Sequence, residues 1–395
     1  MDKKNVAVFF GGRSCEHEIS IITGLQLIEY LDTNKFNIIP VYIARDGRWY
    51  SGQELLNRAI YKDFENKKKV LNEVTLYPYL GQKGLTVTKK ACFFGEKIIP
   101  VDIYFPAFHG EFGEDGCIQG LFELAGVPYI GSGVLPSAIA MSKNTAKTVV
   151  SQYGIPVLPS VTINKELVEK EGIEATKKEI FANNTLKYPV FIKPNNLGSS
   201  IGVSKATNDE ELLIALTKVF KRDKEALIEP YMDNMFEINI SVLDTTEGLR
   251  TSVVEIPVTD GSFLSYEDKY MREGKGKKKG GTPKRSEGMA SLTRSINPVD
   301  LDEKIKNTVS EYAKIAYKAI KASGVGRIDF MYDKNSGTIY LNEFNLIPGS
   351  LSFYLWEKSD PVLLYTEELT KIIDRAFEVY SIKQELDRDT GFKAL

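Results

Sequence analysis

Two carboxylates and one amide near the C-terminal end of the chain are spaced to form an oxygen-donor cluster. Asp329 lies in the stretch GRIDF, and Glu343 and Asn345 lie two residues apart in NEFN. Side chains two apart on a strand share a face, so adjacent antiparallel strands would bring all three together. Such a cluster suits Mg²⁺, which takes carboxylates together with waters and substrate phosphates. The alternative is an exposed acidic strand pair, which the apolar neighbours in both stretches disfavour.

A lysine followed by a glycine-serine loop forms a second group with possible chemistry. In FIKPNNLGSSIGVSK, Lys193 lies on a predicted strand, and the loop contains Gly198, Ser199, Ser200 and Gly202. Small residues let backbone N–H groups approach phosphate oxygens, and the lysine would add positive charge. The loop is not a G-x-x-x-x-G-K-[ST] motif, and by itself such a hairpin is more often a simple turn. Together with the acidic cluster it predicts a site for a nucleotide with its magnesium.

The segment from Gly274 to Gly288 is biased towards lysine and glycine. Such a composition cannot pack a core, so we expect a mobile loop that extends over residues 260–298. It is either a solvated run of charge or a lid over polyphosphate. Its place beside the two motifs favours the lid.

The elements that must position these groups begin with an α/β unit. The apolar run at 6–10 ends at Gly11-Gly12, and residues 17–32 have helical spacing. With strands at 38–43 and 101–108, this pattern predicts an α/β domain with a largely parallel sheet. We expect the lysine-rich residues 61–72 to form a surface insertion.

Two further units follow, and we expect domains over 1–131, 132–231 and 232–395. The central unit should contain helices at 136–153 and 208–222 and strands at 188–194, 201–205 and 226–231. The last unit should contain strands at 237–244, 249–257, 325–333 and 338–345 and helices at 301–322 and 361–381.

Composition narrows the class of partner. The 51 basic and 53 acidic residues nearly cancel, which disfavours nucleic acid or an anionic membrane as a partner and favours a small molecule. Three scattered cysteines do not suit a disulfide framework. No stretch of about 18 apolar residues is present, so we expect a soluble, cytoplasmic protein with no membrane span.

Several motifs, taken in order, resemble those of a known family. MSKNTAK, YPVFIKPNNLGSSIGVS, LIEPYMDNMFEINISV, GRIDF and LNEFN with its following PG resemble the ATP-grasp enzymes. VAVFFGGRSCEHEIS and FPAFHGEFGEDGCIQGLFELAGVPYIGSG narrow the resemblance to D-alanine–D-alanine ligases. The similarity extends from residue 6 to about residue 380.

The resemblance implies a fold and an activity. The fold would be α/β (α+β), an ATP-grasp fold with an N-terminal parallel-sheet domain. ATP would phosphorylate one D-alanine, and the amine of a second would attack the acyl phosphate to give D-alanyl-D-alanine, ADP and phosphate. Two Mg²⁺ ions, for which Mn²⁺ could substitute, would assist. A homodimer supplying peptidoglycan precursors is expected.

The resemblance also assigns roles to residues of the nucleotide site. It places Lys143, Lys193, Ser200 and Lys269 at the phosphates. It places Glu229 at the adenine amino group and Glu237 at the ribose hydroxyls. Asp329, Glu343 and Asn345 would carry the metal ions.

For the amino-acid substrates, the resemblance implies that Glu16 binds the ammonium group of the first D-alanine. Glu16 would be linked through Ser199 to Tyr270. His109 would lie near the first carboxylate. Arg327 and the backbone N–H of Gly349 would stabilise the transferring phosphoryl group and the oxyanion. Tyr270 favours an amine over a hydroxy acid as the nucleophile.

Two departures from the family pattern concern the second substrate. The segment PGSLSFYLWE is shorter than expected, so Ser352, Tyr354 or neither grips the second carboxylate, and we favour Ser352. The loop after Tyr270 is longer and richer in lysine than expected. Alternative functions are therefore a ligase for another acceptor such as D-serine, or a catalytically silent nucleotide-binding homologue. Glu114 is left unassigned, because a surface or capping role is equally expected for it.

Overall fold

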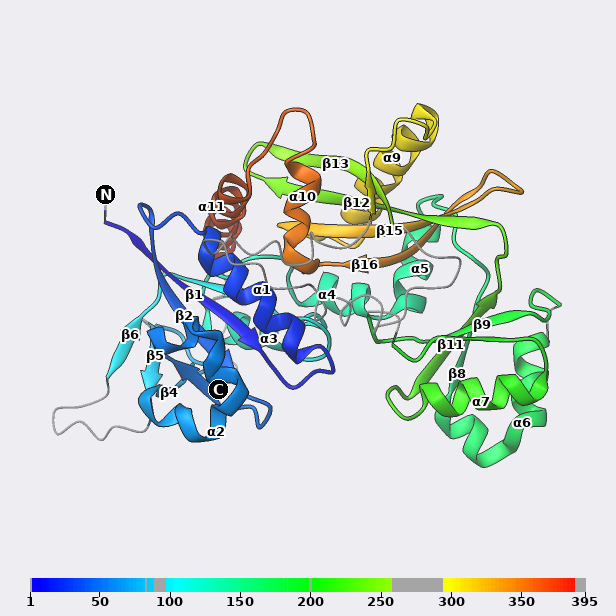
Figure 1. The fold of residues 1–395 in the computed structure, drawn as a ribbon, viewed down its shortest axis with the longest axis horizontal. Helices are drawn as coiled ribbons and strands as arrows, with labels where there is room; N and C mark the ends of the chain where they lie inside the picture. Colours follow the sequence, from blue (N-terminus) through cyan, green and yellow to red (C-terminus); the bar gives the residue numbers. More distant parts are fainter. Residues whose placement is uncertain are drawn as a thin grey trace, which may run out of the picture.

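The computed structural model describes residues 2–81, 84–88, 97–182, 184–198, 201–257 and 294–387. Across these ranges the strands form three sheets, of seven, four and five strands. The N-terminal sheet and the four-stranded sheet lie at opposite ends of the molecule, with the five-stranded sheet between and above them (Figure 1). Each sheet falls within one of the three predicted segments, whose boundaries as domains stay predictions.

The N-terminal sheet mixes parallel and antiparallel pairing in the order β6-β5-β4-β3-β2-β1-β7. Its strands are β1 (Lys4–Gly11), β2 (Phe36–Ile43), β3 (Trp49–Ser51), β4 (Asn72–Thr75), β5 (Gly84–Val87), β6 (Ile98–Pro100) and β7 (Ile103–Pro106). Helices α1 (His17–Tyr30), α2 (Phe64–Lys67) and α3 (Cys117–Ala125) belong to the same unit, together with 3-10 turns at Gln53–Leu56, Arg58–Asp63 and Lys68–Val70.

The prediction of an α/β unit with parallel strands is confirmed, although the sheet is less parallel than expected. Among the described strands, β1 pairs in parallel with β2 and β7, whereas β2 to β6 pair antiparallel. The extra strands have three or four residues each. Strands this short carry too little alternation to be recognised from the sequence.

The central unit is built on an antiparallel sheet of order β10-β9-β11-β8. It comprises β8 (Val161–Asn164), β9 (Val190–Pro194), β10 (Ser204–Ala206) and β11 (Glu225–Pro230), with helices α6 (Lys165–Phe181) and α7 (Asp209–Val219). Neither β8 nor α6 was predicted. The expected single helix at 136–153 is two helices, α4 (Val134–Met141) and α5 (Lys143–Ser151). The break occurs at Ser142, whose extended backbone and hydroxyl cap α5 by accepting the Thr145 N–H.

The C-terminal sheet has the order β14-β13-β12-β15-β16, and every pairing in it is antiparallel. Its strands are β12 (Met235–Thr245), β13 (Gly248–Pro257), β14 (Arg294–Ile296), β15 (Val325–Asp333) and β16 (Ile339–Asn345). Helix α9 (Glu303–Ala319) packs on one face and buries Val309, Ala313, Ala316 and Tyr317 against the sheet. On the opposite face Trp356 covers Ser241, to whose Oγ it donates its Nε1 hydrogen, and the part of that face that carries Asn239 and Asp329 lines a cleft.

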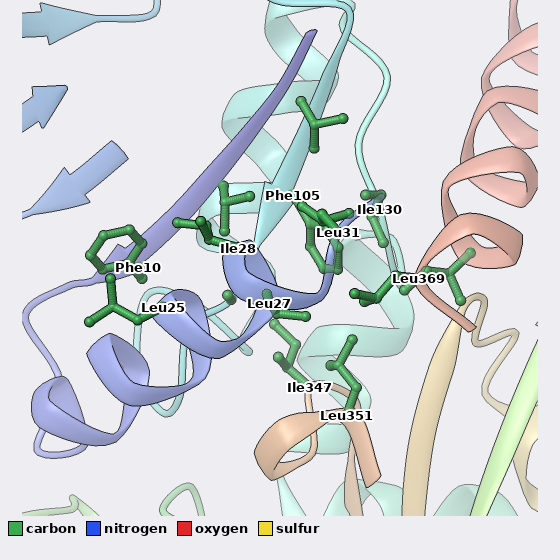
Figure 2. Close-up of a cluster of buried hydrophobic side chains, with 14 of the residues drawn as sticks. Phe10, Leu25, Leu27, Ile28, Leu31, Phe105, Ile130, Ile347, Leu351 and Leu369 are labelled. Carbon is green, nitrogen blue, oxygen red and sulfur yellow. The ribbon is translucent and has the colours of Figure 1, made fainter. Parts of the chain in front are cut away.

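The end of the chain packs back onto the N-terminal unit. Helices α10 (Phe353–Trp356) and α11 (Tyr365–Gln384) share one hydrophobic core with α1 and β1. In Figure 2, Ile347 and Leu351, which follow β16, lie below Leu27 of α1, and Leu369 of α11 lies near Leu31. The loop after β16 is therefore held between the N-terminal unit and the C-terminal sheet. No helix in the described ranges is long and apolar enough to cross a membrane.

Candidate active site

A cleft between the three sheets collects most of the residues predicted to carry chemistry. It encloses about 1630 Å³, including space open to solvent. The predicted site residues that line it are Glu16, His109, Lys143, Lys193, Glu229, Glu237, Arg327, Asp329, Glu343, Asn345, Gly349 and Tyr354. The acidic cluster and the glycine-containing hairpin at Gly198 thus face the same space.

Strand register places a row of polar side chains across the floor of the cleft. Cross-strand pairing aligns Glu255, Asn239, Asp329 and Glu343 on β13, β12, β15 and β16. Two positions before Asp329 on the same strand, Arg327 donates Nε to Asp329 Oδ1 at 2.6 Å and Nη2 to Oδ2 at 2.7 Å. Residues two apart share a strand face, so the sequence spacing G-R-I-D itself produces this bidentate pair.

The predicted metal ligands are close enough to act together. Asp329 is the direct cross-strand partner of Glu343, and Asn345 donates Nδ2 to Asp329 Oδ2 at 3.1 Å. A carboxylate offers about four lone-pair sites, so the bonds from Arg327 leave Asp329 able to ligate a cation. Within the described ranges, no group of three or more His, Cys, Asp or Glu could hold a metal ion. Two carboxylates and one amide oxygen leave positions for the waters and substrate phosphates that Mg²⁺ keeps as ligands, so this donor set would suit Mg²⁺.

Three buried lysines pair with two glutamates, Glu343 in this row and Glu229 beside it. Lys143, at the start of α5, lies 3.2 Å from Glu343 and also donates to the Leu197 carbonyl. Lys193 on β9 lies 2.7 Å from Glu229, which also pairs with Lys147. The Lys193 ammonium further donates to Asn342 Oδ1 at 2.9 Å.

These lysines repel one another as well as pairing with the acids. Burial and the nearby Lys143 lower the pKa of Lys193 to about 8. Burial, Lys193 and Lys143 also lower the pKa of Lys147 well below its ordinary value. An additional polyanion at this point would relieve the repulsion, which is the electrostatic condition for binding a triphosphate. Lys147 was not predicted, although its spacing of four from Lys143 in MSKNTAK places both on one face of a helix.

Glu16 lies in the turn between β1 and α1, where a Cβ added at Gly198 of the hairpin would lie 3.4 Å from Glu16 Oε2. Its backbone N–H donates to Ser14 Oγ at 3.1 Å, and that hydroxyl donates to the His109 carbonyl at 2.6 Å. A Cβ added at Gly110 would lie 2.9 Å from Glu16 Oε2, so glycine is needed for this close approach. The glutamate is 6% exposed, and its carboxylate faces the cleft.

His109 and Glu114 reach from the N-terminal unit to the loop after β16. Both hydrogen-bond to the backbone of Ile347, two residues before Gly349. Burial and Arg327 lower the pKa of His109 to about 4, so the imidazole is neutral near pH 7. Burial and Glu16 raise the pKa of Glu114 to about 8, so this carboxyl is mainly protonated there. Glu114 lines the cleft, a position that an isolated acid in a sequence does not reveal.

The structure separates the two candidates for the second carboxylate. Ser352 is fully buried, and among the described residues its Oγ has no hydrogen-bond partner and its side chain does not line the cleft. The cause is local, because Ser350, Leu351 and Ser352 have left-handed backbone angles that turn Ser352 into the core. The geometry therefore does not support the role favoured for Ser352. Tyr354 does line the cleft.

Four predicted residues lie outside the described ranges, namely Ser199, Ser200, Lys269 and Tyr270. Besides Glu114, the residues that line the cleft without having been predicted include Asn239, Glu255, Arg294 and Asn342. Asn342 directly precedes Glu343 in NEFN, and the others lie on strands whose register the sequence alone does not give.

Comparison with known proteins places this geometry in context. Two family profiles match the chain: "D-ala D-ala ligase N-terminus" over residues 5–132 and "D-ala D-ala ligase C-terminus" over residues 149–373. The D-alanine–D-alanine ligase of Acetivibrio thermocellus is 34% identical, with 96% of this chain and 97% of that protein aligned. The ligase of a Thermoanaerobacter species is 37% identical, with 97% and 99% aligned.

Solved structures of similar proteins cover nearly the whole chain. The VanG D-Ala:D-Ser ligase from Enterococcus faecalis superposes with a TM-score of 0.75 at 34% identity, covering 95% of this chain and all of its own. The D-alanine–D-alanine ligase from Coxiella burnetii gives a TM-score of 0.77 at 26% identity, covering 98% and 97%.

Proposed function

The chain belongs to the D-alanine–D-alanine ligase family, and from this membership and its cleft we propose that it joins two D-alanines with ATP. The products are D-alanyl-D-alanine, ADP and phosphate. One observation carries the proposal: Lys143 and Lys193 face the Arg327–Asp329–Glu343 group across the same cleft that holds Glu16 and His109. A phosphate-binding end and an amino-acid-binding end therefore share one space.

Each group suits one part of the reaction. Lys143 and Lys193 neutralise the nucleotide phosphates, while Glu229 and Glu237 receive the adenine amino group and the ribose hydroxyls. Glu16 binds the ammonium of the first D-alanine, and the neutral His109 lies beside its carboxylate. Ser199, Ser200, Lys269 and Tyr270 complete the site as the family resemblance assigns them. Arg327, held by Asp329, and the Gly349 N–H stabilise negative charge on the transferring phosphoryl group and the tetrahedral oxyanion.

Asp329, Glu343 and Asn345 would hold magnesium. Bound there, the metal would neutralise charge that develops on the phosphates. Arg327, Lys143 and Lys193, which line the same cleft, would perform the rest of that neutralisation.

The acceptor is the least determined part of the function. D-serine is a second candidate, because the structurally similar VanG protein at 34% identity is a D-Ala:D-Ser ligase. A catalytically silent homologue is disfavoured by the joint presence of Arg327, Asp329, Glu343 and Asn345 in the cleft. We further propose a cytoplasmic homodimer that supplies peptidoglycan precursors.

Product analysis tests the proposal. The protein is incubated with ATP, Mg²⁺ and D-alanine, alone or with D-serine or D-lactate, and the products are identified by mass spectrometry. We expect D-alanyl-D-alanine in the absence of any other acceptor. Exclusive formation of a mixed product would assign a different acceptor, and no D-alanine-dependent product would support the silent homologue.

A further inference from the structure

We propose that Arg294, Glu255 and Tyr354 form the seat of the second amino acid, with Arg294 binding its carboxylate and Glu255 its ammonium group. The inference rests on the proposed ligase function and adds the residues that select the acceptor. It predicts that the acceptor is a zwitterionic α-amino acid.

The three side chains form one buried, connected group. Arg294 Nη1 lies 2.7 Å from Glu255 Oε2, and the guanidinium carbon lies 4.1 Å from the centre of the Tyr354 ring. Tyr354 donates its hydroxyl to Glu255 Oε1 at 3.2 Å, and Asn239 Nδ2 donates to the same oxygen at 3.1 Å. The side chains of Arg294 and Glu255 are 8% and 2% exposed, and burial and Glu255 raise the pKa of Tyr354 to about 12.

This group lies beside the reacting centre. Glu255 belongs to the cross-strand row that continues through Asn239 to Asp329. Arg294, Glu255 and Tyr354 all line the cleft, as do Arg327 and Gly349. In this row a single residue, Asn239, separates Glu255 from Asp329.

Among the described residues, Ser352, the other candidate for the second carboxylate, does not line the cleft. The segment PGSLSFYLWE turns Ser352 into the core, which leaves the cleft wall after Gly349 to Tyr354. A tyrosine ring beneath a guanidinium orients the planar fork of the arginine, and that fork matches a carboxylate in two parallel hydrogen bonds.

The Arg294–Glu255 pair presents a positive and a negative group side by side. An α-amino acid carries an ammonium and a carboxylate group on the same Cα. Its carboxylate can pair with Arg294 and its ammonium with Glu255, so the internal ion pair is replaced by two new pairs. No buried charge is then left unpaired, which keeps the energetic cost low. A hydroxy acid such as D-lactate would leave Glu255 without a cation, and an amide would leave Arg294 without an anion.

An internal competition tests the seat. The protein receives ATP, Mg²⁺ and D-alanine as donor, with D-alanine and D-alaninamide competing as acceptors, and the ratio of dipeptide to dipeptide amide is measured by mass spectrometry. A charge-assisted bidentate contact is worth about 10- to 100-fold in discrimination. We therefore expect Arg294→Gln to lower the wild-type ratio by at least about tenfold, and Arg294→Lys to lower it by less.

The same design with D-lactate tests Glu255. Glu255→Gln should lower the ratio of dipeptide to depsipeptide, because the ammonium loses its counter-charge while the hydroxyl does not. Arg250→Gln is the matched control, since Arg250 lies on the same strand and over the Trp356 ring but does not line the cleft. It should leave both ratios unchanged.

Each ratio is measured within one enzyme sample, so partial unfolding of a variant cancels. Wild-type ratios retained by Arg294→Gln and Glu255→Gln would overturn the seat while leaving the ligase function intact. Absence of any D-alanine-dependent product in the wild-type protein would overturn the ligase function, and the seat with it.

Discussion

Substitution of Glu229 by glutamine should destabilise the protein even though it changes only one atom type. Glu229 is 1% exposed and lies between Lys147 and Lys193. At the 2.7 Å separation from Lys193 and an effective dielectric constant of about 20, the lost attraction is about 6 kcal/mol before desolvation is subtracted. Removing the carboxylate also removes the cost of burying its charge, so the net loss of unfolding free energy should be about 3–5 kcal/mol.

The loss should depend on pH with a definite sign. Lys193 has a pKa of about 8 in the folded protein, and without Glu229 that pKa falls further. A lysine that is neutral in the folded state but charged in the unfolded chain makes stability rise with pH. Between about pH 6.5 and 8, the free energy of unfolding of the variant should therefore rise by up to about 1.4 kcal/mol per pH unit relative to that of the wild-type protein.

Urea unfolding of both proteins at these two pH values measures the effect. Glu166→Gln is the control, because the Lys170–Glu166 pair has side chains 74% and 79% exposed and should contribute nothing measurable. A loss below about 1 kcal/mol for Glu229→Gln, or a difference that grows as pH rises, would refute the electrostatic account of the lysine cluster.

Four further outcomes are expected. Ser352→Ala should leave the Michaelis constant for the second amino acid unchanged in steady-state kinetics, since its hydroxyl is buried away from the cleft. EDTA should stop ADP release and added Mg²⁺ should restore it, while the nucleotide-free thermal midpoint stays constant because protein donors already satisfy the acidic cluster. The pKa of the Glu114 carboxyl is raised to about 8 in the folded protein, so the free energy of unfolding falls as pH rises from the unfolded pKa of this group to about 8. Glu114→Gln removes this effect and should raise the urea midpoint at pH 9 more than at pH 6. Gly24→Ala would place a Cβ 2.5 Å from Phe10 Cβ and should cost about 1–3 kcal/mol in urea unfolding, whereas Gly120→Ala, with open space around its Cβ, should not.

Period and spacing predicted the parts of the site that lie within one strand pair. The two-residue periodicity of NEFN placed Glu343 with Asn345, and the antiparallel register brings both to Asp329, as the sequence predicted. Arg327 was assigned by the family resemblance, and it lies two residues before Asp329 on the same strand. Long elements such as β1 and α9 could also be predicted from the sequence, because their apolar residues continue over a whole strand or over several helical turns.

Groups assembled from distant segments could not be predicted in this way. Glu255 and Arg294 meet because β13 pairs with β14, and sequence periodicity does not specify strand order. The burial of Ser352 has another cause. Three consecutive left-handed residues follow Gly349, and nothing in S-L-S distinguishes them from an ordinary turn.

The central claim is that one cleft brings nucleotide phosphates and D-alanine together for reaction. Coupled measurement of ADP release, with D-alanine as the sole amino acid and Mg²⁺ present, tests it most directly. We predict D-alanine-dependent release with one ADP formed for each dipeptide, and loss of that release in Arg327→Met. ADP release that is independent of D-alanine, or none at all from the folded wild-type protein, would contradict the account.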